Sequence, residues 1–202
     1  MSRKRIFYIV FFSLLVVVFF IALGYAIPGF RNPRMNPISV VQPWTFLNQD
    51  GKPVTESISS GKVTAVNYFF TTCPVVCPKM MGNLKPVYEA FKDEKDFLML
   101  SFTSDPEVDS VPVLKRFADS LSVNTDKWVF LTGRKDSLYN TARYSYRIDD
   151  PKNFVTRIED DFLHTQFIAL VNKKGEVVKI YDGIKPSEMS EMEAEIKKLL
   201  KE

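Results

Sequence analysis

Two cysteines and one histidine are the residues of this chain whose types and spacing could do chemistry. Cys73 and Cys77 lie in the stretch TTCPVVCPKM, with three residues between them and a proline after each. They are the only cysteines in 202 residues, and His164 is the only histidine. Thiolates are nucleophiles and soft metal ligands, and imidazole is a common metal ligand as well. The pair could therefore form a disulfide, a redox couple or part of a metal site.

The sequence around the cysteines favours reactive thiols over a structural bond. Proline disfavours helix at the residue before it, so Pro78 predicts that regular helix begins near Cys77. The unpaired N–H groups and the dipole of a helix N-terminus favour the thiolate. A structural disulfide between Cys73 and Cys77 would close a very small loop and remove little entropy from the unfolded chain.

The spacing bears on the choice between redox and metal chemistry. Dithiol oxidoreductases of the thioredoxin type carry two residues between their cysteines, whereas this chain has three. The longer spacing permits a disulfide but opens the loop enough to admit an ion. If His164 approaches the sulfurs, the resulting Cys₂His set favours Cu(I), because zinc usually takes a fourth ligand. A lone histidine is more often a surface residue, and the helical spacing of Met80 and Met81 fits core packing better than ligation.

Alternating strand and helix patterns must position these residues. The cysteines follow a nearly continuous apolar strand, and helical spacing begins directly after them. This order predicts an α/β fold, a mixed sheet with helices on both faces. It places the cysteines at the carboxyl end of a buried strand, which is where open α/β sheets carry their functional sites. Strands are predicted at 62–71, 96–105 and 128–133, hairpins within 44–55 and 165–183, and helices over 80–91, 111–121, 137–144 and 186–200, the last with Ser187 as N-cap.

The N-terminus predicts a membrane anchor. Arg3, Lys4 and Arg5 precede residues 6–27, which carry no charge and as a helix would span about 30 Å. We expect an anchor over 1–27, a proline-containing linker over 28–43 and one domain over 44–202. A cleaved signal peptide is the competing interpretation, although the apolar region of a signal peptide is usually shorter than this uncharged run. The leading basic residues place the domain on the outer side of the membrane, in a periplasm or an intermembrane space.

Charge and cysteine content exclude other classes of protein. The net charge of +3 comes largely from the basic residues before the apolar segment, so nothing indicates a nucleic-acid surface. Two cysteines are also too few for a disulfide-framework domain.

Taken together, these motifs resemble the Sco/SenC family, membrane-anchored thioredoxin-like proteins that deliver copper during cytochrome c oxidase assembly. The similarity rests on TTCPVVCP, SFTSDPEVDS, WVFLTG and HTQFIALVNKKGEV. It implies a thioredoxin-like fold with an N-terminal β-hairpin, copper ligands at Cys73, Cys77 and His164, and a supporting or docking role for Asp105 and Asp109, whose alternative role is loop and helix capping. The chain departs from many members in having Val75 or Val76 at the position where an acidic residue lies between the cysteines, and Thr72 where a histidine precedes them.

The resemblance implies a copper metallochaperone that delivers its cargo to the binuclear copper centre of cytochrome c oxidase subunit II. Cys73 and Cys77 would bind Cu(I), with His164 completing the site and suiting Cu(II) as well. The main alternative is a thiol-disulfide oxidoreductase that reduces the cysteines of the oxidase copper site, with Cys73 as the attacking thiolate and Cys77 resolving the mixed disulfide. A peroxiredoxin-like peroxidase, which would leave His164 unexplained, and a redox sensor are further alternatives.

Overall fold

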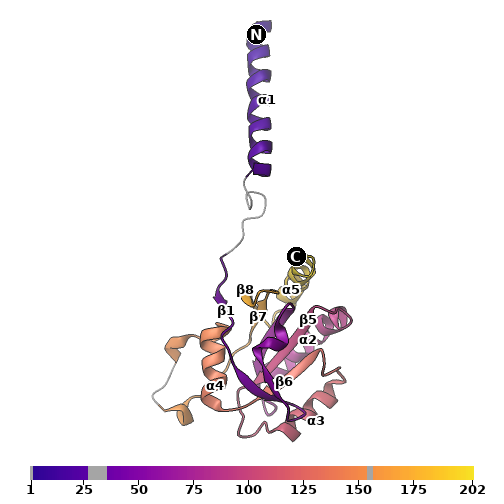
Figure 1. Ribbon diagram of the computed structural model, residues 1–202, viewed down its shortest axis with the longest axis vertical. Helices are drawn as coiled ribbons and strands as arrows, with labels where there is room; N and C mark the ends of the chain where they lie inside the picture. Colours follow the sequence, from indigo (N-terminus) through magenta and orange to yellow (C-terminus); the bar gives the residue numbers. More distant parts are fainter. Residues whose placement is uncertain (1, 27–35, 154–156) are drawn as a thin grey trace. The chain divides into compact units, whose positions relative to one another are not determined.

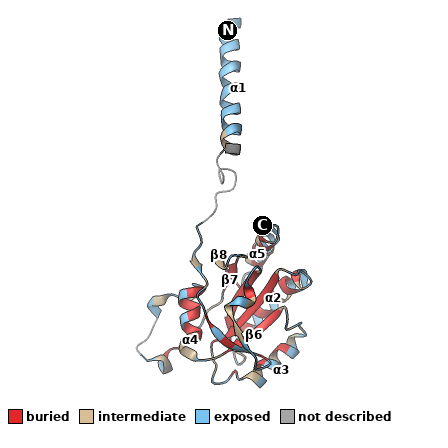
Figure 2. Ribbon diagram, viewed as in Figure 1, coloured by how far each residue is buried: buried red, intermediate tan, exposed pale blue. Residues whose placement is uncertain are grey.

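The computed structural model describes residues 2–26, 36–153 and 157–202. The chain separates into two compact units, Met1–Asn36 and Pro37–Glu202. The first unit contains helix α1 (Arg3–Ala26), which is exposed along nearly all of its described length (Figures 1 and 2). By length and composition α1 could cross a membrane, but a signal sequence meets the same criterion. The anchor over 1–27 therefore stays a prediction.

The second unit is built on one mixed sheet, which contains eight strands in the described residues. Their order is β1-β8-β7-β4-β5-β6-β2-β3. β4 pairs in parallel with β5, and β5 with β6, whereas the other neighbours are antiparallel. The strands are β1 (Ser39–Val40), β2 (Thr45–Asn48), β3 (Pro53–Thr55), β4 (Val63–Phe69), β5 (Phe97–Thr103), β6 (Trp128–Thr132), β7 (Phe167–Val171) and β8 (Glu176–Asp182).

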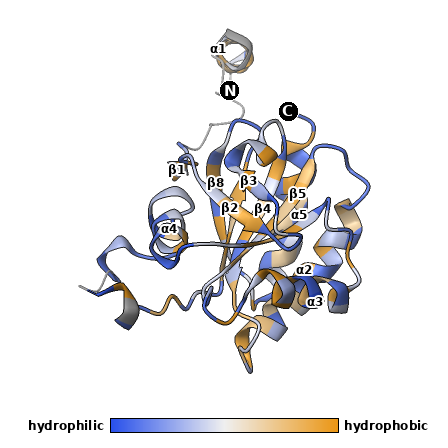
Figure 3. Cartoon of the chain, turned by 60° about the horizontal axis from the view of Figure 1, so that its bottom comes forward, coloured by the Kyte–Doolittle hydropathy of each residue, from blue (hydrophilic) through white to orange (hydrophobic). Residues whose placement is uncertain are grey.

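Helices cover both faces of this sheet, which is why its central strands are buried throughout and mostly apolar. Every residue of β4 and of β5 is buried, as expected for parallel strands covered on both sides. Val63 and Ala65 face a core shared with α2, α3 and α5, whereas Val66 and Tyr68 face a core shared with α4 and the π-helical turn η2. Figure 3 shows apolar strands between helices of mixed hydropathy. These elements are α2 (Val76–Phe91), α3 (Val111–Leu121), α4 (Lys135–Asn140), η2 (Thr141–Ser145) and α5 (Pro186–Leu199).

Most of the predicted elements are confirmed. The β2–β3 hairpin turns at Gly51, whose φ of 72° is in the left-handed region that glycine adopts at little cost. Part of the predicted linker, Ser39–Val40, forms β1 and pairs with β8, while residues 28–35 of it lie outside the described residues.

The prediction of Ser187 as N-cap of the last helix is wrong. Lys185 is the extended residue that flanks α5, and Pro186 takes the first helical position, where its fixed φ and missing N–H cost nothing. The Glu188 carboxylate in the first turn instead accepts a hydrogen bond from the Asp182 N–H at 2.6 Å.

Candidate metal centre

The cysteine loop joins the carboxyl end of β4 to the start of α2. Cys73 lies in the loop and is half-buried, and Cys77 lies in the first turn of the helix and is buried. The Cys73 N–H donates to the Phe70 carbonyl at 3.2 Å, and the Cys77 N–H donates to Cys73 Sγ at 3.3 Å. Both residues are free thiols. The predicted position of the pair, at the junction of a buried strand and a helix N-terminus, is confirmed.

The two thiols differ in acidity because they differ in burial and in hydrogen bonding. Burial acts to raise the pKa of Cys73, but hydrogen bonds from the Cys77 backbone and thiol and from the Val75 and Val76 N–H groups outweigh it and lower the pKa. Burial is the largest cause that raises the pKa of Cys77 to about 12; a hydrogen bond with the Phe70 backbone opposes it, and the neighbouring Cys73 and Asp109 add to it. Cys73 is therefore the accessible, more readily ionised sulfur.

Asp109 holds the base of the cysteine loop. Its carboxylate is fully buried and accepts hydrogen bonds from the Thr71 N–H at 3.1 Å and from the Thr71 hydroxyl. The Thr103 hydroxyl donates to the same carboxylate at 2.6 Å. This arrangement fits a supporting role, because it ties the residues before Cys73 to the end of β5. The Asp105 side chain is half-exposed, and the role predicted for it stays a prediction.

His164 lies in an extended segment that leads into β7, and its side chain is exposed. Nδ1 of the imidazole is 3.2 Å from the Phe162 carbonyl oxygen. The ring packs against two aromatic side chains, with centroid distances of 4.4 Å to Phe162 and 5.6 Å to Phe70. The histidine is thus accessible, and its orientation is limited by its aromatic neighbours.

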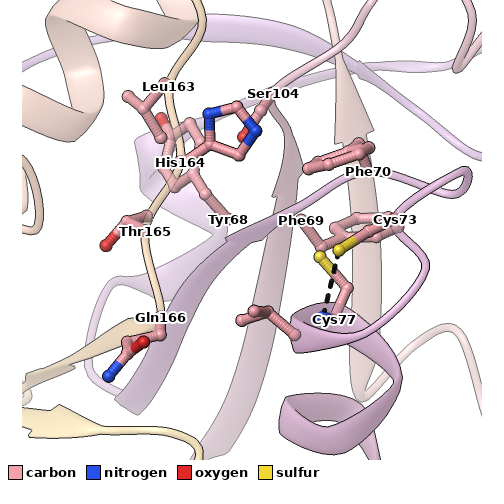
Figure 4. A pocket seen from close by; sticks show the side chains of 11 residues that line it. Tyr68, Phe69, Phe70, Cys73, Cys77, Ser104, Leu163, His164, Thr165 and Gln166 are labelled. Atoms are coloured by element: carbon pink, nitrogen blue, oxygen red, sulfur yellow. Dashed lines mark hydrogen bonds between the residues drawn. The ribbon is translucent and has the colours of Figure 1, made fainter.

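The three candidate ligands line one pocket. A cavity of about 130 Å³ is bordered by Cys73, Cys77 and His164, together with Phe70. Figure 4 shows the two sulfur atoms on one side of this pocket and the imidazole on the other, with the Phe70 ring beside it. Within the part of the chain that the structure describes, no three His, Cys, Asp or Glu side chains are close enough to hold a metal ion. The fold therefore brings the three residues together without closing them into a ligand set.

Met80 and Met81 lie in the core. They are 0% and 3% exposed and pack within the cluster beneath α2, as their helical spacing predicts. The sequence reasoning missed Phe70, which contacts His164 and also lines a second cavity, of about 420 Å³, between α2 and α3. Its position directly before the cysteine loop was the available signal.

Comparisons with known proteins agree with this geometry. Residues 33–201 match the family model described as SCO1/SenC. The chain is 32% identical to the SCO1 protein homolog of Bacillus subtilis over 161 residues, which cover 78% of this chain and 81% of that one.

Solved structures show the same fold. The structure of BsSco, in which a disulfide switch was identified, aligns with a TM-score of 0.68 at 31% identity, covering 82% of this chain and 96% of that one. Bradyrhizobium japonicum ScoI with copper bound aligns with a TM-score of 0.63 at 25% identity, covering 80% of this chain and 99% of that one. The mixed sheet and its flanking helices are thus a thioredoxin-like fold of the Sco type. The chain belongs to the SCO1/SenC family.

Proposed function

We propose that this protein is a copper metallochaperone in cytochrome c oxidase assembly, with Cys73, Cys77 and His164 as the residues that hold the cargo. The observation that carries the proposal is that these three side chains line one pocket. Two thiolates and an imidazole form a donor set that suits Cu(I), and the imidazole suits Cu(II) as well. Relatives from Bradyrhizobium japonicum and Arabidopsis thaliana have been solved with copper bound, which supports copper as the cargo.

Closure of the site requires a small rearrangement. His164 must approach the sulfurs, and the Phe70 ring, which packs edge-on against the imidazole, must shift as it does so. The first sulfur to meet the metal is that of Cys73, because Cys77 is buried. Ion binding then requires the loss of the Cys77 proton, since thiols bind copper as thiolates.

Release of copper follows from the same geometry. A sulfur of the acceptor protein binds the ion while a bond to the half-exposed Cys73 breaks, so that the number of ligands is kept during exchange. We propose the copper-binding subunit II of cytochrome c oxidase as the acceptor and the outer face of a membrane as the location, with α1 as the anchor. Oxidation of the two thiols to a disulfide would remove both sulfur ligands and stop loading.

The experiment that tests the proposal is an anaerobic Cu(I) titration of the reduced, detergent-solubilised chain against a competing chelator, with His164→Ala alongside. We expect one tightly bound copper per chain and weaker binding by the variant. Equal affinities would exclude His164 as a ligand.

A thiol-disulfide oxidoreductase is the second candidate, and the unequal acidity of the cysteines supports it. The Cys73 thiolate would attack a partner disulfide and displace one partner thiolate. Cys77 would then lose its proton and attack Cys73 Sγ, which releases the second partner thiolate; the partner gains two electrons and this chain forms a disulfide. Copper-independent trapping of an oxidised partner by Cys77→Ser, through a mixed disulfide at Cys73, would favour this function.

A further inference from the structure

Arg143 is a buried arginine that neither the copper proposal nor the thiol alternative uses. Its side chain is 2% exposed and lies in η2, on the face of the sheet opposite α2. The guanidinium forms a two-pronged contact with Asp161, at 2.8 and 3.1 Å, and its Nε donates to Asp149 at 2.7 Å. The two carboxylates compensate the charge of the buried guanidinium, because an unpaired charge in the protein interior would be strongly destabilising.

Asp161 begins the extended segment that carries His164, and alternate residues of this segment are fixed to the same part of the domain. Leu163 is buried in the core with Leu138. The Thr165 hydroxyl donates to the Ile148 carbonyl at 2.8 Å. Because side chains alternate along an extended backbone, fixing residues 161, 163 and 165 directs residues 162 and 164 outward.

The exposure of the segment follows this alternation. Asp161 and Leu163 are buried, whereas Phe162 and His164 are exposed. Residues 161–166 belong to no helix or strand, and the described strand pairing reaches them only at their end, where the Gln166 carbonyl accepts a hydrogen bond from the Gly183 N–H at 2.8 Å. The Arg143–Asp161 contact supplies the first fixed point, three residues before the histidine.

We propose that Arg143 is a positioning residue for His164: through its two-pronged contact with Asp161 it sets the register of residues 161–165 and so keeps the imidazole in the pocket with the cysteines. An arginine suits this task because its planar fork matches a carboxylate in one orientation, which a lysine cannot reproduce. The part of this inference that concerns copper rests on the proposed function.

Asp161→Asn and Asp149→Asn form a matched pair of variants. Each neutralises one carboxylate that pairs with the same buried arginine, but only Asp161 lies on the segment that carries His164. We expect Asp161→Asn to weaken copper binding about tenfold, the lower end of what loss of a ligand-orienting residue costs, and Asp149→Asn to change it less than about twofold. The imidazole-nitrogen splitting in the EPR spectrum of the Cu(II)-loaded protein should weaken only in Asp161→Asn.

A double-mutant cycle separates positioning from general stability. In a His164→Ala background, Asp161→Asn should cost less than about twofold, because the ligand that it orients is gone. An equal loss with and without His164, or equal losses in the two aspartate variants, would overturn the inference. If Asp161→Asn does not fold, Arg143→Lys, which keeps the charge but loses the fork, takes its place and should show the same dependence on His164.

Amide hydrogen exchange tests the inference without copper. Exchange at residues 161–166 should quicken in Asp161→Asn and stay unchanged in Asp149→Asn. If His164→Ala binds copper as tightly as the wild type, the proposed ligand set is wrong, and the exchange data alone decide whether Arg143 fixes this segment. Unchanged exchange in both aspartate variants would overturn the inference even if the ligand set is right.

Discussion

Brief alkylation of the reduced protein at pH 8 should modify Cys73 and leave Cys77 nearly untouched. The thiolate is the form that reacts, and the two sulfurs differ in how readily they ionise. Hydrogen bonds from the first turn of α2 lower the pKa of Cys73 below its usual value of 9.0, whereas burial raises that of Cys77 to about 12.

The size of the preference follows from these values. At pH 8 a thiol of pKa about 12 is ionised to about one part in 10⁴, and one below 9.0 to at least about one part in ten, a ratio of at least ~10³. A more basic thiolate is also a better nucleophile, and over three pKa units this reduces the preference for Cys73 by about 20- to 30-fold. The net preference is about 30-fold or more, before the burial of Cys77 is counted.

The assay is a short anaerobic treatment with iodoacetamide, followed by proteolysis and mass spectrometry of the two cysteine-containing peptides. Reaction at Cys73 should rise with pH and reach half of its maximal rate below pH 9, whereas reaction at Cys77 should continue to rise toward pH 12. In the chain unfolded in urea, iodoacetamide should label both cysteines at similar rates. In Cys73→Ser, slow labelling of Cys77 would show that the protection is not caused by a first alkyl group. Equal labelling in the folded protein, or faster labelling of Cys77, would refute the reasoning.

Two substitutions test the packing around the site by thermal and denaturant unfolding. In Gly183→Ala the added Cβ would lie 2.9 Å from the Gln166 carbonyl oxygen. We expect the free energy of unfolding to fall by about 1–3 kcal/mol, which lowers Tm by about 2–4 °C per kcal/mol. Gly82→Ala, whose added Cβ meets no atom within 4 Å, is the control and should not destabilise the protein. Asp109→Asn leaves at least one buried donor unpaired and should cost about 1–3 kcal/mol, whereas Asp105→Asn should stay within about 0.5 kcal/mol. Wild-type stability in Gly183→Ala or in Asp109→Asn would contradict the contacts described here.

The sequence predicts the cysteine half of the site well, for local reasons. A nearly continuous apolar run identifies β4 as a central strand, and two prolines mark the turn into α2, so the position of Cys73 and Cys77 follows from the residues next to them. The fold class follows equally from the alternation of strands and helices.

The histidine half depends on contacts between distant residues. The segment before β7 has no helical or strand period, and its position is set by Arg143 and Ile148, neither of which a local pattern connects to His164. A charged arginine in a polar stretch also suggests solvent exposure, whereas Arg143 is buried. The wrong N-cap at Ser187 has a related cause, because Pro186 already supplied the helix start.

The place of β7 in the sheet couples completion of the fold during synthesis to completion of the candidate metal site. β7 follows His164 directly and pairs with β4, the strand that leads to the cysteines, in the interior of the sheet. Because a chain is synthesised from its N-terminus, β4 cannot pair with β7 until most of the domain has been synthesised. A chain truncated before residue 164 lacks both the histidine and the strand that completes the core. Any quality control that recognises an unfinished sheet therefore also removes chains with an unfinished site.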